Sequence, residues 1–391
     1  MERATEIALT KELLGLNAQK SAFLVDSVAK RSVADYFDEV RFRRERDDVL
    51  RTSPTPLVHS SELPDSGSFL RRDFAGLPVF FTRDTDGVAH AFLNVCRHRG
   101  TRLVDDERGC KQRFSCPYHA WTWNNRGELV GVPHEQQGFP DLARDELGLR
   151  RLGCTEKYGW LWVWAHSEEA PDVDASLAGL AEDFDWFGSS DHQLLHTDER
   201  ICGANWKILV EGGIEAYHFR VTHRNTIAPY FFDNLSSYRT FGTHMRSILA
   251  KRSLAELADQ PAEAWQLRDH AQVLYSIFPT NSFLVQADHF AWVQLDPLTA
   301  SSTRVRVSTL VPKYRVESAE DLAHWRKNHD ITMKTLAEDF DIGERIQAGL
   351  ESGANDHLTF GRFEGALAEF NRCADSLLDM RRARLSAHLQ C

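Results

Sequence analysis

The chain has 391 residues, of which 42% are hydrophobic and 26% are charged, and its formal net charge is −11. This length suits two domains, and the composition is that of a globular protein with an ample core. The negative charge argues against nucleic acid as a partner and favours a small substrate or a basic protein. The sequence shows neither a signal-peptide pattern nor an apolar run long enough for a membrane span, so we expect a cytoplasmic protein.

The predicted elements change character along the chain. Residues 1–45 interleave apolar and charged residues in mixed helical patterns. The strand-like runs 77–83 and 88–96 are then joined by the turn signal DTDG, which predicts a β-hairpin. The sequence YGWLWVWA at residues 158–165 indicates a buried strand. This stretch therefore predicts a small all-β domain built of hairpins.

A larger α+β region follows. Residues 194–219 pass from a strand pattern to a helix pattern, residues 270–312 predict three or four antiparallel strands, and residues 323–352 predict a helix. We expect an α+β protein in which an all-β domain precedes a larger domain with an antiparallel sheet flanked by helices. The expected boundaries are residues 1–45 for an N-terminal helical part packed on the larger domain, residues 46–166 for the β domain and residues 167–391 for the larger domain.

Two cysteines and two histidines form the first candidate metal site. Cys96 and His98 follow the pattern C-x-H, and after seventeen residues Cys116 and His119 follow the pattern C-x-x-H. We expect each pair at the tip of a β-hairpin, where two loops can approach each other. Two thiolates and two imidazoles suit either zinc or a Rieske [2Fe–2S] cluster. One cysteine and one histidine from each loop favours the Rieske cluster, in which the cysteines hold one iron and the histidines the other.

The remaining cysteines and two further histidines lie outside this pattern. Cys110 falls between the two loops, and His134 and His166 are interpreted as surface or packing residues. Free cysteine packs as a small hydrophobic side chain, so we expect structural or incidental roles for the other four cysteines: Cys154, Cys202, Cys373 and Cys391.

A second candidate site lies further along the chain. His218 and His223 are five positions apart, which is about one and a half helical turns. Their side chains can converge if the helix bends or ends between them. Two histidines with one carboxylate are the usual frame for a non-haem Fe(II) that activates O₂.

The two motifs together resemble a known family. The sequences CRHRG and CPYHAWTW, beginning at Cys96 and Cys116, and NWKILVEGGIEAYHFRVTH, from Asn205 to His223, are similar to motifs of the oxygenase component of Rieske non-haem iron ring-hydroxylating oxygenases. The resemblance covers roughly residues 40–380. It implies a [2Fe–2S] cluster at the first site and a mononuclear Fe(II) at the second, with O₂ as co-substrate.

The resemblance also implies roles for acidic residues. It assigns His218 and His223 as ligands of the catalytic iron and points to an aspartate on a late helix as the third ligand. The segment LAEDFDIGERIQAGLES resembles the branch acting on quaternary ammonium compounds and places this ligand at Asp339, with Asp341 as the alternative. Glu215 matches the acidic residue that bridges a Rieske histidine of one subunit to an iron histidine of the next.

One departure from the family pattern concerns the start of this motif. Many members have Glu-Asn where this chain has Glu211-Gly212, followed by a second glycine, Gly213. The asparagine near the iron is therefore missing. Glycine costs about 1 kcal/mol relative to alanine inside a helix, so we expect the pair to make room for substrate or to permit a distortion of the helix.

The electrons must come from another protein. The sequence contains neither a dinucleotide-binding G-x-G-x-x-G after a strand nor plant-type ferredoxin spacing. NAD(P)H and flavin are therefore expected on a separate reductase, acting with or without a ferredoxin. The resemblance implies a homotrimer, alone or with a second type of subunit, in which His119 of one copy faces Glu215 and His218 of the next.

The substrate is indicated least clearly. Aromatic residues near the second site are candidates for its pocket: Phe231, Phe232, Phe283 and Trp292, with Tyr230, Phe278 and Phe290 nearby. We favour an aromatic compound. A quaternary ammonium compound is the alternative, because aromatic rings attract such cations. The reaction can be dihydroxylation, monohydroxylation or oxidative demethylation.

Two readings outside this class remain. A pure Rieske electron carrier would lack the second iron motif, and a structural zinc protein would lack the cluster. Three irons per chain are expected for the two-site enzyme, and two for the carrier.

Overall fold

A computed structural model describes the backbone of residues 1–388 and the side chains of residues 1–382. It mixes helices and antiparallel sheets, as the sequence predicts. The chain divides into two compact units, one formed by Met1–Leu50 with the described chain from Leu177 onward and the other by Arg51–Ser176. These boundaries fall later in the chain than the sequence suggested. Cys391 lies outside the described residues.

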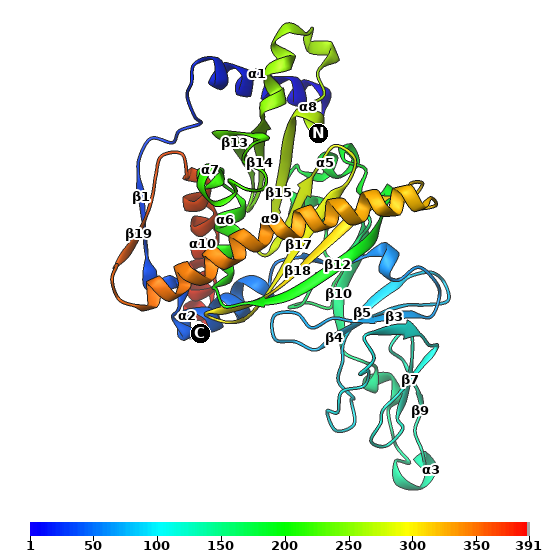
Figure 1. Cartoon of the computed structure of the whole chain (residues 1–391). Helices are drawn as coiled ribbons and strands as arrows, with labels where there is room; N and C mark the ends of the chain where they lie inside the picture. Colours follow the sequence, from blue (N-terminus) through cyan, green and yellow to red (C-terminus); the bar gives the residue numbers. More distant parts are fainter. Residues whose placement is uncertain (389–391) are drawn as a thin grey trace. The chain divides into compact units, whose positions relative to one another are not determined.

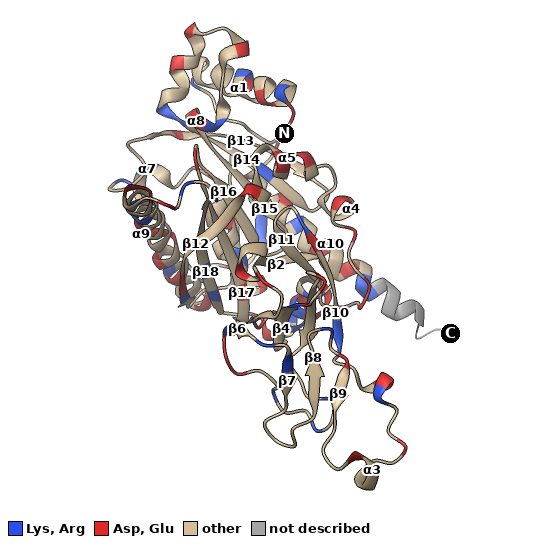
Figure 2. Cartoon of the chain, turned by 90° about the vertical axis from the view of Figure 1, so that its right-hand side faces the viewer, with Lys and Arg blue, Asp and Glu red and all other residues tan. Residues whose placement is uncertain are grey.

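The smaller unit is built on a seven-stranded sheet with the order β2-β11-β10-β5-β4-β3-β6, in which all neighbours are antiparallel. A separate three-stranded sheet has the order β7-β8-β9, so each strand pairs with the next one along the chain (Figure 2). The predicted hairpin is present, because β4 and β5 pair from Val79–Leu93 to Arg83–Ala89. The strands are β2 (Thr55–His59), β3 (Ser68–Arg71), β4 (Val79–Arg83), β5 (Ala89–Leu93), β6 (Arg108–Cys110), β7 (Arg113–Ser115), β8 (Thr122–Asn124), β9 (Leu129–Gly131), β10 (Arg151–Lys157) and β11 (Trp160–Trp164).

The larger unit contains a second seven-stranded antiparallel sheet with the order β12-β18-β17-β16-β15-β14-β13 (Figure 1). The region predicted as three or four strands forms four, β15 to β18, each paired with the next. Neither β15 nor β16 carries a charged side chain, and in Figure 2 they lie within the sheet. The strands are β12 (His192–Cys202), β13 (Phe231–Phe241), β14 (His244–Lys251), β15 (Ala271–Ile277), β16 (Asn281–Val285), β17 (Phe290–Thr299) and β18 (Ser302–Pro312).

Helices pack on this sheet. The long helix α9 (Ala319–Glu351), which covers all but the last residue of the predicted helix, runs across the strands in Figure 1. It begins at Ser318, whose side chain accepts a hydrogen bond from the backbone of Asp321 and so caps the helix. The other helices of this unit include α1 (Arg3–Ala18), α2 (Glu39–Glu45), α5 (Ala181–Trp186), α6 (Trp206–Gly213), α7 (Phe219–Thr222), α8 (Leu267–His270) and α10 (Gly365–His388).

The N-terminal segment is only partly helical. Besides α1 and α2 it contains the strand β1 (Ala29–Ser32), which pairs with β19 (His357–Phe360) near the other end of the chain. Local sequence patterns do not predict the strand β1, because a strand of four residues forms only when its distant partner is in place.

A buried ion pair joins this segment to α6. Both Glu45 and Lys207 have fully buried side chains, and the Lys207 ammonium lies 2.7 Å from each carboxylate oxygen of Glu45. The indole of Trp206 donates to the same carboxylate at 3.0 Å. Removing one partner of such a pair is costly, because the other charge stays buried without compensation. The pair thus fixes α6, which leads directly into the second candidate site.

No helix within the described part of the chain is both long enough and apolar enough to cross a lipid bilayer.

Candidate metal centres

The two loops of the first site share one backbone geometry. In the first, the amide of Cys96 donates to the carbonyl of Thr101 at 2.8 Å, and the amide of Gly100 donates back to Cys96 at 3.0 Å. In the second, Cys116 bonds Trp121 at 2.8 Å and Ala120 bonds back at 2.9 Å. The fifth residue of each loop has positive φ, +80° at Gly100 and +56° at Ala120.

The prediction that both loops lie at hairpin tips is confirmed for one loop and wrong for the other. The loop of Cys116 joins β7 to its partner β8, as a hairpin does. The loop of Cys96 joins β5 to β6, which are not neighbours in the sheet, since β6 pairs with β3. The tight turn is local, whereas strand pairing is decided by the whole sheet.

The side chains of this site turn inward. Cys96 and Cys116 are buried, and His98 and His119 lie with their ring centroids 4.8 Å apart. The indole of Trp121 stacks on His98, with centroids 4.7 Å apart and planes 6° from parallel. Such stacking fixes the plane of the imidazole.

Two buried nitrogen atoms support a metal role. The Nδ1 atoms of His98 and His119 are buried and have no hydrogen-bond partner among the described residues. Buried polar groups are otherwise almost always paired, so a bound metal with these two nitrogen atoms as ligands would explain why neither has a hydrogen-bond partner. Desolvation, with the neighbouring His119 and Arg99, lowers the pKa of His98 and favours the neutral form that ligates metal. The donor set of two thiols and two imidazoles fits a [2Fe–2S] cluster.

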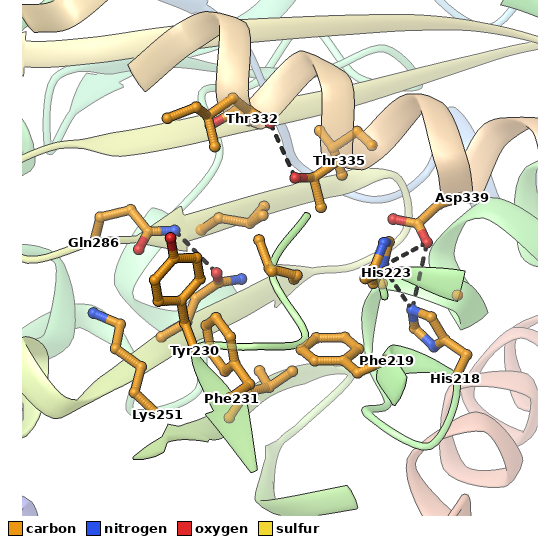
Figure 3. Close-up of a pocket in the computed structure, with 18 of the residues that line it drawn as sticks. His218, Phe219, His223, Tyr230, Phe231, Lys251, Gln286, Thr332, Thr335 and Asp339 are labelled. Carbon is orange, nitrogen blue, oxygen red and sulfur yellow. Dashed lines mark hydrogen bonds and ion pairs between the residues drawn. The ribbon is translucent and has the colours of Figure 1, made fainter. Parts of the chain in front are cut away.

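Three groups converge at the second site (Figure 3). The Nε2 atoms of His218 and His223 are 3.1 Å apart, and the Oδ1 atom of Asp339 lies 3.4 Å from the first and 3.0 Å from the second. Ligand atoms of all three lie within 4.8 Å of one another. Two imidazole nitrogens and a carboxylate oxygen on one point form the donor set of a non-haem iron site.

The local fold explains the convergence of the histidines. Helix α6 ends at Gly213, and a single helical turn, α7, then places His218 immediately before its first residue and His223 immediately after its last. We expected one helix to bend or end between the two histidines; instead a separate short turn lies between them. Asp339 arrives from α9, more than a hundred residues further along the chain.

The close contacts within this triad shift the pKa values of its members. Burial alone would lower the pKa of His218, but hydrogen bonds with Asp339 and Glu215 outweigh it and raise the pKa to about 10. Burial alone would raise the pKa of Asp339, yet the two histidines hold it below its ordinary value. A divalent cation binding at these atoms would replace the protons that now link them.

Two further carboxylates orient the imidazoles from outside. Glu215 accepts a hydrogen bond from Nδ1 of His218, and Glu338 lies 2.8 Å from Nδ1 of His223. Glu338 also accepts from the hydroxyl of Thr226 at 2.6 Å. A carboxylate on Nδ1 leaves Nε2 free to bind metal. Sequence analysis did not identify Glu338, although it directly precedes Asp339 in the quoted segment.

Asp341, the alternative third ligand, lies apart from the triad. Its side chain is 60% exposed and contacts Arg200 at 3.3 Å. Residues that are two positions apart on a helix point about 200° away from each other around its axis. When Asp339 faces the histidines, Asp341 therefore faces away.

A cavity of about 310 Å³ adjoins the triad. Its roof is one stripe of α9, and strands β14 to β16 and the segment from α6 to β13 form the other walls (Figure 3). Gly212 and Gly213 line it, and a Cβ atom on either would meet no atom within 4 Å. Other lining residues are Phe219, Ile227, Tyr230, Phe231, Leu249, Lys251, Gln272, Leu284, Gln286, His289, Asn328, Ile331, Thr332, Thr335 and Leu336.

The prediction of aromatic lining residues needs correction. Tyr230 and Phe231 line the cavity, but the other candidates do not: Phe232, Phe278, Phe283, Phe290 and Trp292. Side chains alternate between the faces of a strand. Leu284 faces the cavity, so its neighbour Phe283 and the cross-strand partner Trp292 point to the opposite face, where both are fully buried. Phe232 differs from Phe231 in the same way and lies beside Arg252.

Comparison with known proteins gives matches to both halves of the chain. Residues 173–379 match the model of the ring hydroxylating alpha subunit (catalytic domain), and residues 53–152 match that of the Rieske [2Fe–2S] domain.

Individual relatives are similar over part of their length. The hydroxylase subunit alpha of methanesulfonate monooxygenase from Methylosulfonomonas methylovora is 29% identical over 50% of this chain and 50% of its own. Subunit alpha of biphenyl 2,3-dioxygenase from Rhodococcus jostii is 32% identical over 45% of this chain and 39% of its own. The chain thus spans half or less of the length of these curated relatives. The crystal structure of the quaternary ammonium Rieske monooxygenase CntA, with an inhibitor, has a TM-score of 0.76 at 21% identity and covers 90% of this chain and 96% of its own, which shows a shared fold.

Proposed function

Because the chain belongs to the ring-hydroxylating alpha subunit family, we propose that it is the terminal oxygenase component of a multicomponent Rieske oxygenase. The proposed reaction uses O₂ to hydroxylate or oxidatively demethylate a small organic substrate. The observation that carries the proposal is the convergence of His218, His223 and Asp339 at one end of a cavity. These three residues are the proposed iron ligands, and Cys96, His98, Cys116 and His119 the proposed ligands of the cluster.

The chain's own residues would do most of the positioning. When bound, the cluster supplies single electrons and the mononuclear iron supplies the chemistry of O₂ activation. Glu215 and Glu338 hold the Nδ1 atoms of the two histidines, so that both Nε2 atoms point to one place. The apolar wall of the cavity, including Phe219 and Phe231, excludes water from the substrate.

We also propose that the site is served by other chains. A separate reductase, with or without a ferredoxin, would deliver electrons, and copies of this chain would associate as a homotrimer, alone or with a second type of subunit. In this assembly His119 of a neighbouring copy would donate to Glu215, which already binds His218. Such a carboxylate joins two imidazoles by two hydrogen bonds.

Two substrate classes remain under this proposal. The relatives' names include biphenyl on one side and quaternary ammonium compounds on the other. The aromatic and aliphatic lining suits an aromatic ring, which we favour. For a cation, Tyr230 and Phe231 offer aromatic faces, but Asp339 is the single lining carboxylate among the described residues and it already contacts both histidines.

Metal analysis with matched variants tests the proposal. Wild-type protein should contain three irons and two acid-labile sulfides per chain, and with a surrogate reductase it should consume O₂ in a substrate-dependent way. Asp339→Asn should retain two irons and the visible spectrum of the cluster, while Asp341→Asn keeps all three. Two irons in the wild type would indicate an electron carrier, and zinc without sulfide would refute both metal assignments.

A further inference from the structure

The end of the cavity away from the triad is polar and carries one cation. Lys251 is the last residue of β14, and Gln272 and Gln286 lie on the adjacent strand β15 and just after β16. Figure 3 shows Lys251 and Gln286 at the opposite end of the group from His218 and Asp339, with Tyr230 and Phe231 between them. The cavity therefore has a metal-binding end, an apolar middle and a basic end.

Among the described residues, the ammonium of Lys251 is in direct contact with no carboxylate. It donates to the backbone carbonyl of Asp269 at 3.2 Å, and no acidic group within the described part of the chain lies within 4.0 Å of it. Burial lowers the pKa of Lys251, against the weaker opposing influence of the charges of Asp269 and Asp288. A partly buried cation with no carboxylate in direct contact is unfavourable, and an anionic ligand would supply that contact.

Amide groups add neutral donors beside this cation. The side chain of Gln286 donates to that of Gln272 at 2.9 Å. This pairing uses the side-chain oxygen of Gln272, so its NH₂ group can donate to a ligand. An oxyanion at this end could thus accept from one ammonium and one amide, which is a common way to bind a carboxylate or sulfonate.

The middle of the cavity restricts what can be attached to the anion. Its walls there are mostly aliphatic and aromatic, from Phe219, Phe231, Leu249, Leu284 and Leu336. With about 310 Å³ available, the cavity is at the small end of ligand sites, which run from roughly 300 to 1,000 Å³. A small molecule with an anionic head and a compact apolar body fits this arrangement.

We propose that the substrate is a small organic anion, a carboxylate or sulfonate, whose charged group is bound by Lys251 with help from Gln272. The body of the molecule then lies along the apolar walls and presents its reacting carbon to His218, His223 and Asp339. This inference rests on the proposed oxygenase function and names the substrate class of that same site. An aromatic acid and a betaine share this chemistry, since both carry a carboxylate. A quaternary ammonium cation that lacks a carboxylate would bring its positive charge into the same cavity as that of Lys251.

Matched ligands and variants test the assignment. The ligands are benzoate and benzenesulfonate with benzamide as neutral counterpart, and glycine betaine with choline as its counterpart lacking a carboxylate. Binding is measured by calorimetry on iron-loaded protein and by the change each ligand causes in the electron paramagnetic resonance spectrum of the nitric oxide adduct of the iron. Turnover is measured as O₂ uptake with product mass. Lys251→Met removes the charge and keeps the length of the side chain, Lys251→Arg keeps the charge, and Lys334→Met changes an exposed lysine of α9 as a control.

The expected result is a preference for anions that depends on the charge at position 251. Wild type should bind at least one anion more tightly than its counterpart by about tenfold or more, and in Lys251→Met this preference should fall to within about twofold of equal binding. Lys251→Arg and the Lys334→Met control should retain the preference. Preference for benzoate or for betaine tells the two sources of the carboxylate apart.

Three outcomes would overturn the inference: tighter binding of benzamide or choline than of the anions, an unchanged ratio in Lys251→Met, or no binding of any anion at millimolar concentration. Iron and sulfide counts on every sample separate this failure from failure of the proposed function. A protein with three irons that oxidises only neutral or cationic compounds loses the anion assignment alone. A protein without the third iron loses the oxygenase proposal.

Discussion

Replacing Glu338 by leucine removes the carboxylate that holds His223 in place. In the structure this carboxylate accepts from Nδ1 of His223 at 2.8 Å and from the hydroxyl of Thr226 at 2.6 Å. Loss of such an outer partner weakens metal binding by about tenfold to a hundredfold, which equals about 1.4 to 2.7 kcal/mol. The reason is that the imidazole loses both its fixed tautomer and its orientation, so Nε2 no longer points reliably at the iron.

The assay is equilibrium dialysis of Fe(II) against a competing chelator, with the visible spectrum of the cluster as an internal check on the other centre. Glu338→Leu should release the third iron at a chelator concentration at which wild type retains it. Thr226→Val is the matched control, because it removes one bond to Glu338 but leaves the bond to His223, and its iron affinity should stay within a fewfold of wild type. An Fe(II) affinity of Glu338→Leu within twofold of wild type would refute the reasoning.

Three further predictions concern the same region. Burial raises the pKa of Glu211 to about 7, against the opposing hydrogen bonds from Asn371 and Tyr36. The stability that the neutral carboxyl contributes is complete below its ordinary pKa of 4.5 and is lost as the pH rises to about 7, a total of about 3 kcal/mol. Glu211→Gln should therefore raise the melting temperature at pH 8 but not at pH 4.5, and equal shifts at both would contradict this. Glu215→Gln should slow coupled turnover by about tenfold or more with the cluster still reducible; wild-type turnover would exclude the bridge. Gly212→Ala should raise the melting temperature, since alanine favours a helix by about 1 kcal/mol, and should reduce kcat/KM for the bulkiest substrates; an equal effect on substrates of every size would argue against contact with substrate.

The sequence by itself determined the parts that depend on short spacings. The two Cys–His pairs, the histidines at positions 218 and 223 and the strands from β15 to β18 are all visible as local patterns. Each follows from residues within a few positions of one another, where backbone geometry dictates which side chains can meet. The family resemblance added Asp339, which spacing alone could not connect to histidines on a distant segment.

Only the tertiary structure decided which face each side chain presents. Whether Asp339 or Asp341 meets the histidines depends on the rotation of α9 about its axis. Whether Phe283 or its neighbour Leu284 lines the cavity depends on which side of the sheet is covered by α9. Lys251 gave no signal in the sequence, because one lysine at the end of a strand is ordinary until its surroundings are known. Periodicity shows that a helix or strand has two faces, but long-range packing chooses the one that becomes the site.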